Sequence, residues 1–220
     1  MLTRRSILAG AGALLAPAAW GAVAGEAMPP IEILRFAITR NGSRIGRHVV
    51  QLDQQGGVVT ARIAVEVAVS IGPIVVYRYT LGATETWRDG RFATFQSDCD
   101  DNGTKLFVRA RAGADGVEVA TQAVSRVVLR ADTIPMTHWN RAILRAPLFE
   151  ARDGAPARPK VTPRGAEAVA LADGRTIPAE RFSLTGDIEL DEWYDADGRW
   201  VAMRTTGRDG SIIEYRRLGG

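Results

Sequence analysis

The stretch TIPMTHWN, residues 133–140, places a histidine, a tryptophan and an asparagine side by side. The imidazole of His138 titrates near neutral pH and can act as acid, base or ligand. Trp139 offers an apolar or sugar-stacking wall, and Asn140 offers a hydrogen bond. The alternative is a structural corner, in which Trp139 caps the core and His138 bonds a loop carbonyl. The chain has no Gly-x-Ser-x-Gly or His-Glu-x-x-His motif, so we expect a corner, and binding rather than catalysis if the triplet is functional.

A second candidate set lies in the stretch YRYTLGATETW. A continuous strand would point four of its side chains the same way: Tyr77, Tyr79, Glu85 and Trp87. A carboxylate among aromatic rings suits a ligand-facing surface, and burial would raise its pKa. A bulge at Gly82 would reverse the register and separate these side chains, so both arrangements stay open.

Three aspartates follow in SDCDDNG, namely Asp98, Asp100 and Asp101. Clustered carboxylates can bind calcium or raise one another's pKa for acid–base chemistry. Turn formation is the alternative, because Asp and Asn side chains bond their own backbone in turns. Alternation would put Asp98 and Asp100 on one side of a strand. We expect turn chemistry here and keep Asp98 as a possible binding or acid–base group.

The sequence predicts neither a metal site nor a cofactor. Asp195 and Asp197 before Gly198 have the spacing of a calcium loop, but the remaining ligands of an EF-hand are missing. Cys99 is the only cysteine, which excludes an intramolecular disulfide and a zinc site built on several thiolates. His48 shares its expected strand face with apolar residues, which indicates a hydrogen-bonded histidine at the edge of the core.

The elements that must position these residues are β-strands. Asn-Gly or Asp-Gly pairs, which accept the positive φ angles of type I′ turns, recur along the chain at positions 41, 89, 102, 115, 153, 173, 197 and 209. Period-two alternation runs between several of them, as in Leu34, Phe36 and Ile38. Strands are predicted near 34–39, 44–53, 62–69, 74–87, 91–97, 105–110, 117–121, 124–130, 166–171, 175–185, 188–194, 199–206 and 211–217.

About a dozen strands joined by short turns predict an all-β fold, because short turns join only antiparallel neighbours. A sheet of this size must curl, split or close, so we expect an antiparallel curled sheet, either a half-barrel or an open barrel. At most one or two short helices are expected, one of them over residues 139–149 with Thr137 as its N-cap. Residues 151–165 are predicted to be a loop within a single β domain, residues 28–220.

Residues 1–27 are predicted to be an export signal. Arg4 and Arg5 precede a short apolar run that ends in small residues, which resembles a twin-arginine signal. We expect cleavage near Ala24 or Ala27, the Tat export machinery as a partner, and a periplasmic or secreted destination. The 28 basic and 25 acidic residues are scattered without a basic run, so no nucleic-acid partner is expected.

Several segments together resemble a known group of sequences: FAITRNGSRIGRH, VYRYTLGATETWRDGR, DCDDNGTKLFV, THWN, LTGDIELDEWYDADGRWVAM and RDGSIIEY. Over most of residues 33–216 the chain resembles an uncharacterised family of exported bacterial proteins, a domain of unknown function. In strand order and export signal it is also similar to the periplasmic lipoprotein-carrier superfamily of half-barrels. That second resemblance implies a curved antiparallel sheet around an apolar cavity that binds a lipid or acyl chain.

Three hypotheses for function follow. The first is a periplasmic binding or carrier protein for an apolar or lipid-like molecule, without cofactor and without catalysis. The second is an enzyme acting on an envelope lipid or glycan, with Glu85, Asp98 or His138 as acid–base groups. Convergence of these three side chains across one cleft would favour it. The third is a structural or interaction module, which an exposed apolar patch would favour.

Overall fold

The computed structural model describes residues 33–219, so the predicted export signal, residues 1–27, lies outside the described residues. This part of the chain forms strands and a single 3-10 helix, η1 (Arg141–Leu144). The strands are β1 (Ile33–Arg40), β2 (Ser43–Gln55), β3 (Val58–Ile71), β4 (Ile74–Arg88), β5 (Arg91–Asp101), β6 (Thr104–Gly113), β7 (Gly116–Thr121), β8 (Val127–Leu129), β9 (Ile134–Met136), β10 (Leu148–Glu150), β11 (Pro156–Ala157), β12 (Lys160–Ala170), β13 (Thr176–Thr185), β14 (Leu190–Tyr194), β15 (Trp200–Thr206) and β16 (Ile212–Arg217).

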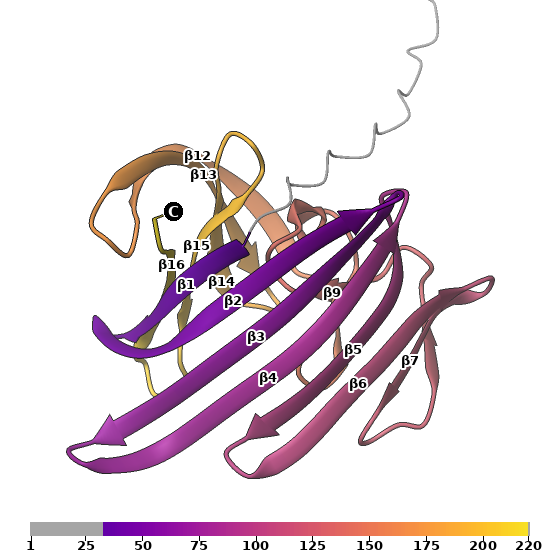
Figure 1. Cartoon of the computed structure of the whole chain (residues 1–220), viewed down its shortest axis with the longest axis horizontal. Helices are drawn as coiled ribbons and strands as arrows, with labels where there is room; N and C mark the ends of the chain where they lie inside the picture. The colour runs from indigo at the N-terminus through magenta and orange to yellow at the C-terminus, as the bar shows by residue number, and fades with distance from the viewer. Residues whose placement is uncertain (1–32, 220) are drawn as a thin grey trace, which may run out of the picture.

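Thirteen strands form one antiparallel sheet, in the order β12-β13-β14-β15-β16-β1-β2-β3-β4-β5-β6-β7-β8. The sheet curls strongly, and its two edge strands do not pair, so it is not closed into a barrel (Figure 1). The predicted fold class, an all-β antiparallel curled sheet of about a dozen strands, is confirmed. A small sheet of β11, β10 and β9 accompanies it.

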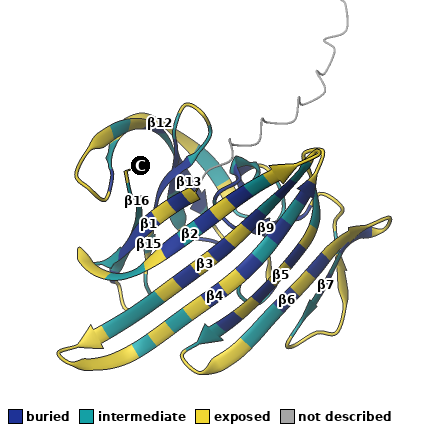
Figure 2. Cartoon of the chain, in the orientation of Figure 1, coloured by how far each residue is buried: buried dark blue, intermediate teal, exposed yellow. Residues whose placement is uncertain are grey.

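Alternating burial along the long strands explains why they form a two-faced sheet (Figure 2). In β3, Ala61, Ile63 and Val65 are buried, whereas Arg62 and Ala64 between them are exposed. This alternation buries one face of each strand and leaves the other to solvent. The hydrophobic stripes of adjacent strands therefore join into one core on the concave side.

Positive backbone angles confirm type I′ turns at three of the eight predicted Asn-Gly or Asp-Gly pairs, whereas at the other five the aspartate does not have a positive φ. Asn41, Asp89 and Asn102 have φ values of 48°, 48° and 52°, and each precedes a glycine with positive φ. Two successive positive φ angles are the requirement of a type I′ turn, whose twist matches the strands that it joins. These turns connect β1 to β2, β4 to β5 and β5 to β6.

Two local predictions are wrong. The short helix expected over residues 139–149 is reduced to a single 3-10 turn, η1, and Asn140, not Thr137, caps it by accepting a hydrogen bond from the backbone N–H of Ala142 at 2.9 Å. Residues 151–165 are not all loop, because β12 begins at Lys160. Pro163 is tolerated there because β12 is an edge strand with a register shift beside that proline.

Residues 134–157 fill the concave face of the main sheet. Trp139 and Phe149 are fully buried there. Trp139 packs edge-on to Trp87 of β4 at a ring-centroid distance of 6.3 Å, and Phe149 packs on Phe95 of β5 at 5.4 Å. Side chains of this segment therefore occupy the centre of the concave face, where the carrier resemblance implies an open apolar cavity.

The C-terminal strands build a second, smaller core. β12 and β13 curl back so that the backbone N–H of Ala172 donates to the carbonyl of Arg217, beyond the intervening strands β14 and β15 (Figure 1). Five buried residues form this core: Leu171, Ala179, Trp193, Val201 and Ala202. In β14, Trp193 alternates with Glu192 and Tyr194, which contact the concave side, so this second core lies on the outer face of the sheet.

Candidate functional site

The predicted site residues Glu85, Trp87 and Trp139 meet on the concave side of β4. Glu85 is fully buried and accepts three hydrogen bonds: from Trp87 Nε1 at 2.5 Å, from Thr137 Oγ1 at 2.7 Å and from Trp139 Nε1 at 2.9 Å. Burial raises the pKa of Glu85 to about 7, and the three donors oppose this rise. The carboxylate therefore fastens the segment at 137–139 to the sheet.

His138 lies next along the same segment and pairs with a second buried carboxylate. Its Nδ1 is 2.5 Å from Glu192 Oε1, and its ring stacks on Trp200 with centroids 5.0 Å apart. Burial is the largest influence and lowers the pKa of His138, but the charge and the hydrogen bond of Glu192, with the charge of Glu150, together outweigh it and the net shift is upward. Burial raises the pKa of Glu192, which His138 opposes. The backbone of His138 has φ of 67°, and its carbonyl accepts a hydrogen bond from Tyr194 at 2.8 Å.

Glu192 is a buried carboxylate in the site that was not among the residues predicted from the sequence. The available signal was alternation. Glu192 stands two residues from Leu190 and two from Tyr194, which places it on an apolar strand face. A carboxylate in such a position needs a partner, and the nearest titratable cation proves to be His138.

The other predicted residues do not join this cluster. Tyr77 and Tyr79 share the concave face with Glu85, so no bulge at Gly82 separates them, but they lie at the far end of β4. Tyr77 donates to Asp101 at 2.8 Å. Asp98 points outward, 74% exposed, and pairs with Arg109 at 2.7 Å.

His48 corrects a further expectation. It is 3% exposed, and both of its ring nitrogens lack a hydrogen-bond partner within the described residues. Its ring is surrounded by Phe36, Trp200 and Tyr215. Burial lowers the pKa of His48 to about 3, with a smaller contribution from the charge of His138. The histidine is therefore a neutral, unsatisfied group in an aromatic setting, and not the hydrogen-bonded one predicted.

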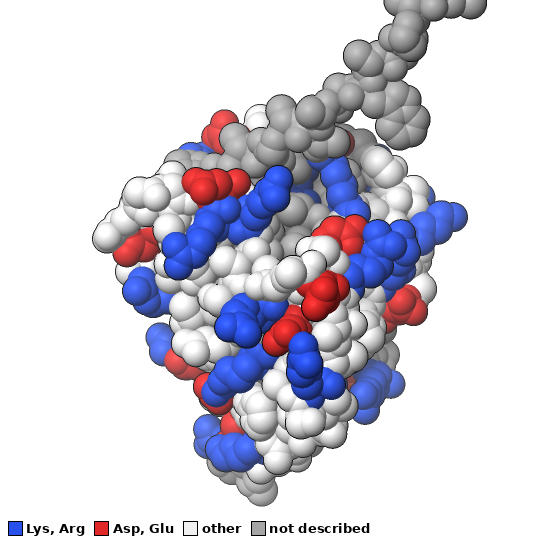
Figure 3. Space-filling model, turned by 90° about the vertical axis from the view of Figure 1, so that its right-hand side faces the viewer, with Lys and Arg blue, Asp and Glu red and all other residues white. Residues whose placement is uncertain are grey.

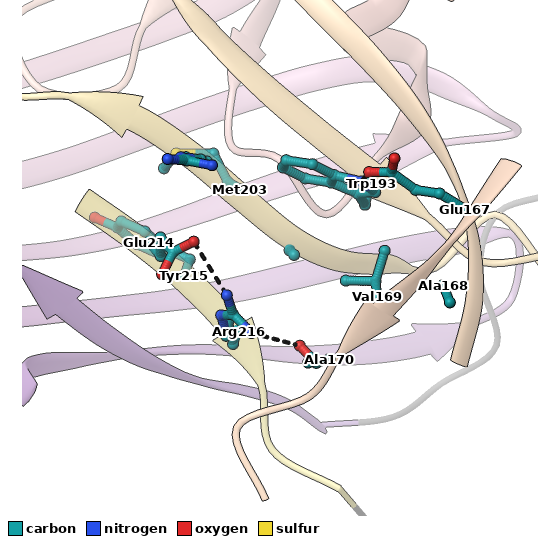
Figure 4. Close-up of a pocket in the computed structure, with 11 residues that line it drawn as sticks. Glu167, Ala168, Val169, Ala170, Trp193, Met203, Glu214, Tyr215 and Arg216 are labelled. Carbon is teal, nitrogen blue, oxygen red and sulfur yellow. Dashed lines mark hydrogen bonds and ion pairs between the residues drawn. The ribbon is translucent and has the colours of Figure 1, made fainter. Parts of the chain in front are cut away.

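A pocket of about 270 Å³ lies on the opposite, outer face, between β12 and strands β14 to β16 (Figure 4). Trp193 supplies an aromatic wall, with Val169 and Ala202 beside it. The indole is fixed: its Nε1 donates to Glu167 at 2.6 Å, and the Arg181 guanidinium lies 5.3 Å from the ring centroid. The strand curl that builds the second core therefore also builds this pocket.

Charged side chains line the rest of the pocket. Arg216 donates to Glu214 at 3.1 Å, whereas the Arg204 guanidinium has no ion-pair or hydrogen-bond partner among residues 33–219. Arg204 also lines an adjoining pocket of about 520 Å³, where Arg181 pairs with Asp191 at 2.7 Å. One wall of the outer groove is thus apolar and aromatic, and one cation at its rim is unpaired.

The remaining outer surface mixes both signs of charge. Figure 3 shows basic and acidic side chains interspersed on the face that includes β6 and β7, where Glu118 pairs with Arg126 at 2.6 Å. The part of the chain that the structure describes holds no cluster of three or more metal-ligating side chains. Its only helix is one turn long, so none of the described helical segments has the length to cross a bilayer.

Comparison with known proteins shows the fold and the family. The structure is similar to the crystal structure of a beta-barrel-like protein of the domain of unknown function DUF1849 from Brucella abortus, with a TM-score of 0.61 and 12% sequence identity. The match covers 87% of this chain and 98% of that chain, and at this identity it shows the fold alone. No curated protein matches the sequence. Residues 36–218 match a family described as a domain of unknown function, DUF6134. This confirms the predicted resemblance to an uncharacterised family, and the chain belongs to the DUF6134 family.

Proposed function

We propose that this protein is a non-catalytic binding protein of the bacterial cell envelope, which holds part of a small amphiphile in the outer pocket beneath β12. The export signal predicted for residues 1–27 supports the location. The observation that carries the proposal is the pocket itself, which is lined by an immobilised indole and by an arginine, Arg204, that has no partner among residues 33–219. The expected ligand is lipid-like, as the sequence suggests, but its place is the outer groove and not the concave face.

The apolar side of the pocket suits a hydrocarbon or ring. Trp193, Val169 and Ala202 present apolar surface without a competing hydrogen-bond donor, since the indole N–H already bonds Glu167. A volume of about 270 Å³ is near the lower end for ligand pockets, which run from about 300 Å³ upward. The pocket therefore has room for one portion of an amphiphile, and the adjoining groove has room for the rest.

The polar side selects an acidic group. Arg204 lines both the pocket and the adjoining groove, and it has no partner within residues 33–219. A guanidinium binds carboxylate or phosphate oxygens in a bidentate manner, which suits a lipid headgroup or a fatty carboxylate. Nearby arginines are already engaged, Arg181 with Asp191 and Arg216 with Glu214. Arg204 is thus the group that we assign to the ligand's charge.

The enzyme hypothesis receives no geometric support. Its three proposed acid–base groups do not converge, because Asp98 points outward and pairs with Arg109. Glu85 is fully buried, and its oxygens are occupied by two indoles and a hydroxyl. A substrate would have to displace these donors to reach the carboxylate, so its raised pKa reflects burial in a structural clamp.

Native mass spectrometry tests this proposal. The protein is purified gently from the envelope of a producing bacterium, and native spectra are compared with denatured spectra and with an organic extract. We expect near-stoichiometric extra mass that the extract identifies as an acidic amphiphile. Val169→Trp fills the pocket and should leave the protein empty, and Arg204→Gln should lower occupancy. Val128→Trp, at a position of β8 that is 43% exposed, is the matched control and should retain the ligand. A ligand-free wild type, or a ligand that Val169→Trp retains, would overturn the proposal.

A further inference from the structure

The hairpin between β3 and β4 extends beyond both neighbouring strands. β2 pairs with β3 only as far as Val67, and β5 pairs with β4 only as far as Tyr79. Residues 69–76, which we call the β3–β4 tip, therefore form a two-stranded ribbon with no strand beside it. The tip projects at the lower left in Figures 1 and 2, where it is exposed.

The β3–β4 tip is apolar although it is exposed. Ile71 is 71% exposed, Ile74 65%, Val76 46% and Val75 37%. Residues 69–76 contain no charged side chain, and their turn is Gly-Pro. Exposed strand ends usually carry charges that prevent association, so a contiguous aliphatic end of this kind marks a surface that binds something.

Unpaired cations stand immediately behind the tip. A groove of about 370 Å³ on the outer face is lined by Arg44, Arg47 and Arg78, and Arg78 lies opposite Ala68 in the β3–β4 pairing. Arg47 pairs with Glu66 at 2.7 Å, whereas the side chains of Arg44 and Arg78 are exposed and have no partner among residues 33–219. The nearest acidic turn is the one between β5 and β6. It neutralises little of the positive charge of Arg44 and Arg78, because its Asp100 already pairs with Lys105.

We infer that the β3–β4 tip inserts into the surface of an anionic lipid bilayer, while Arg44 and Arg78 contact lipid phosphates. Aliphatic side chains at the end and cations one step behind match the apolar and negatively charged layers of such a surface. At about 3.3 Å per residue, three residues of ribbon reach about 10 Å, the depth to which interfacial segments are buried. A partner protein or a second copy of the chain would not require the aliphatic side chains to lie at the end of the hairpin and the cations to lie one step behind them. The inference does not depend on the outer pocket.

Vesicle binding tests this inference. The purified protein is sedimented with vesicles of phosphatidylcholine alone and with vesicles that contain phosphatidylglycerol. We expect binding to the anionic vesicles only, and a decline of binding as salt is raised. The double variant Ile71→Asn/Ile74→Asn should bind at least about tenfold more weakly, and Arg44→Gln and Arg78→Gln should each lower the affinity about fivefold.

The control is Val127→Asn/Val128→Asn, which changes two exposed valines of β8 and should bind as the wild type does. Ile74→Trp provides a second measurement, since its emission should shift to the blue on anionic vesicles and be quenched by lipid-borne quenchers. The tip and arginine variants should have the same melting temperature as the wild type, because their four positions, 44, 71, 74 and 78, are exposed. Equal binding by the tip variants, or no binding by the wild type, would overturn the inference. Self-association without lipid that Ile71→Asn/Ile74→Asn abolishes would overturn it in favour of a second copy.

Discussion

Replacing Glu85 with Gln removes the acceptor that joins the segment at 137–139 to the sheet. The carboxylate accepts from Trp87 on one oxygen and from Thr137 and Trp139 on the other. A glutamine can keep two of these donors on its carbonyl, but its amide N–H₂ then faces the third indole N–H. Two buried donors are left unpaired, which costs about 2–4 kcal/mol of unfolding free energy at pH 8.

The stability difference between the wild type and Glu85→Gln should depend on pH, and the raised pKa of Glu85 determines its direction. The pKa of Glu85 is about 7 in the folded protein against an ordinary value of 4.5, so the folded state holds the proton more tightly. The resulting stabilisation is complete below the ordinary pKa and is lost as pH rises through the folded value. Between pH 5 and pH 8 the wild type should lose about 2.5 kcal/mol from this group, a loss that Glu85→Gln cannot show.

Urea unfolding at both pH values, followed by tryptophan fluorescence, measures this difference. The gap between wild type and Glu85→Gln should be wider at pH 5 than at pH 8. Glu66→Gln, at a side chain that is 52% exposed, is the control and should change stability little. Stability curves that run parallel with pH for wild type and Glu85→Gln would refute the raised pKa of Glu85. A loss of unfolding free energy below about 0.5 kcal/mol at pH 8 would refute the stabilising role of its three hydrogen bonds.

Three further substitutions, with Gly82→Ala as a control for the third, test other parts of the structure by the same unfolding measurement. His138→Gln leaves the Glu192 carboxylate buried without its cation and should cost about 3 kcal/mol at pH 6. Because the pKa of His138 is raised, that advantage of the wild type is complete below pH 6.5 and declines as pH rises through the folded value. His48→Leu removes two unpaired ring nitrogens and should stabilise the protein by about 1 kcal/mol at pH 7. The stability gained in His48→Leu should increase as pH falls, because His48 of the wild type has a folded pKa of about 3 and the folded state therefore loses stability below pH 6.5. A His48→Leu variant less stable than the wild type would contradict this account. Gly46→Ala would place its Cβ 2.1 Å from a backbone oxygen of β3 and should cost about 2 kcal/mol or more, whereas Gly82→Ala has open space and should change little.

The strands were predictable because their cause is local. Alternation and turn pairs predicted a strand near 44–53, and β2 spans Ser43–Gln55. The structure also has Tyr77, Tyr79, Glu85 and Trp87 on one face, which is the uninterrupted one of the two arrangements that the sequence left open. Period-two alternation and turn residues that accept positive φ determine strands and hairpins locally, so their prediction does not require knowledge of distant residues.

The partners of the candidate residues were not predictable in this way, because their cause is long-range. Glu85 bonds Trp139, which lies 54 residues away, and His138 bonds Glu192 at the same separation. Contacts between residues so far apart cannot be predicted from sequence spacing unless the strand order is also known. The outer pocket depends on a still larger feature, the curl that carries β12 across to β16, for which no local signal exists.

The strand order makes the main sheet depend on β16, the last described strand. β1 pairs with β16 in the interior of the sheet, and the backbone N–H of Leu218 donates to the carbonyl of Arg35 at 2.7 Å. The seam between the two halves of the sheet therefore cannot form until synthesis has passed residue 217, so folding of the main sheet waits for β16. For the same reason the first and last described strands are near enough for circular permutation. A chain reopened at the Asn102-Gly103 turn would make this seam a contact between strands adjacent in sequence, and a faster refolding rate would show how much the native separation of β1 and β16 delays folding.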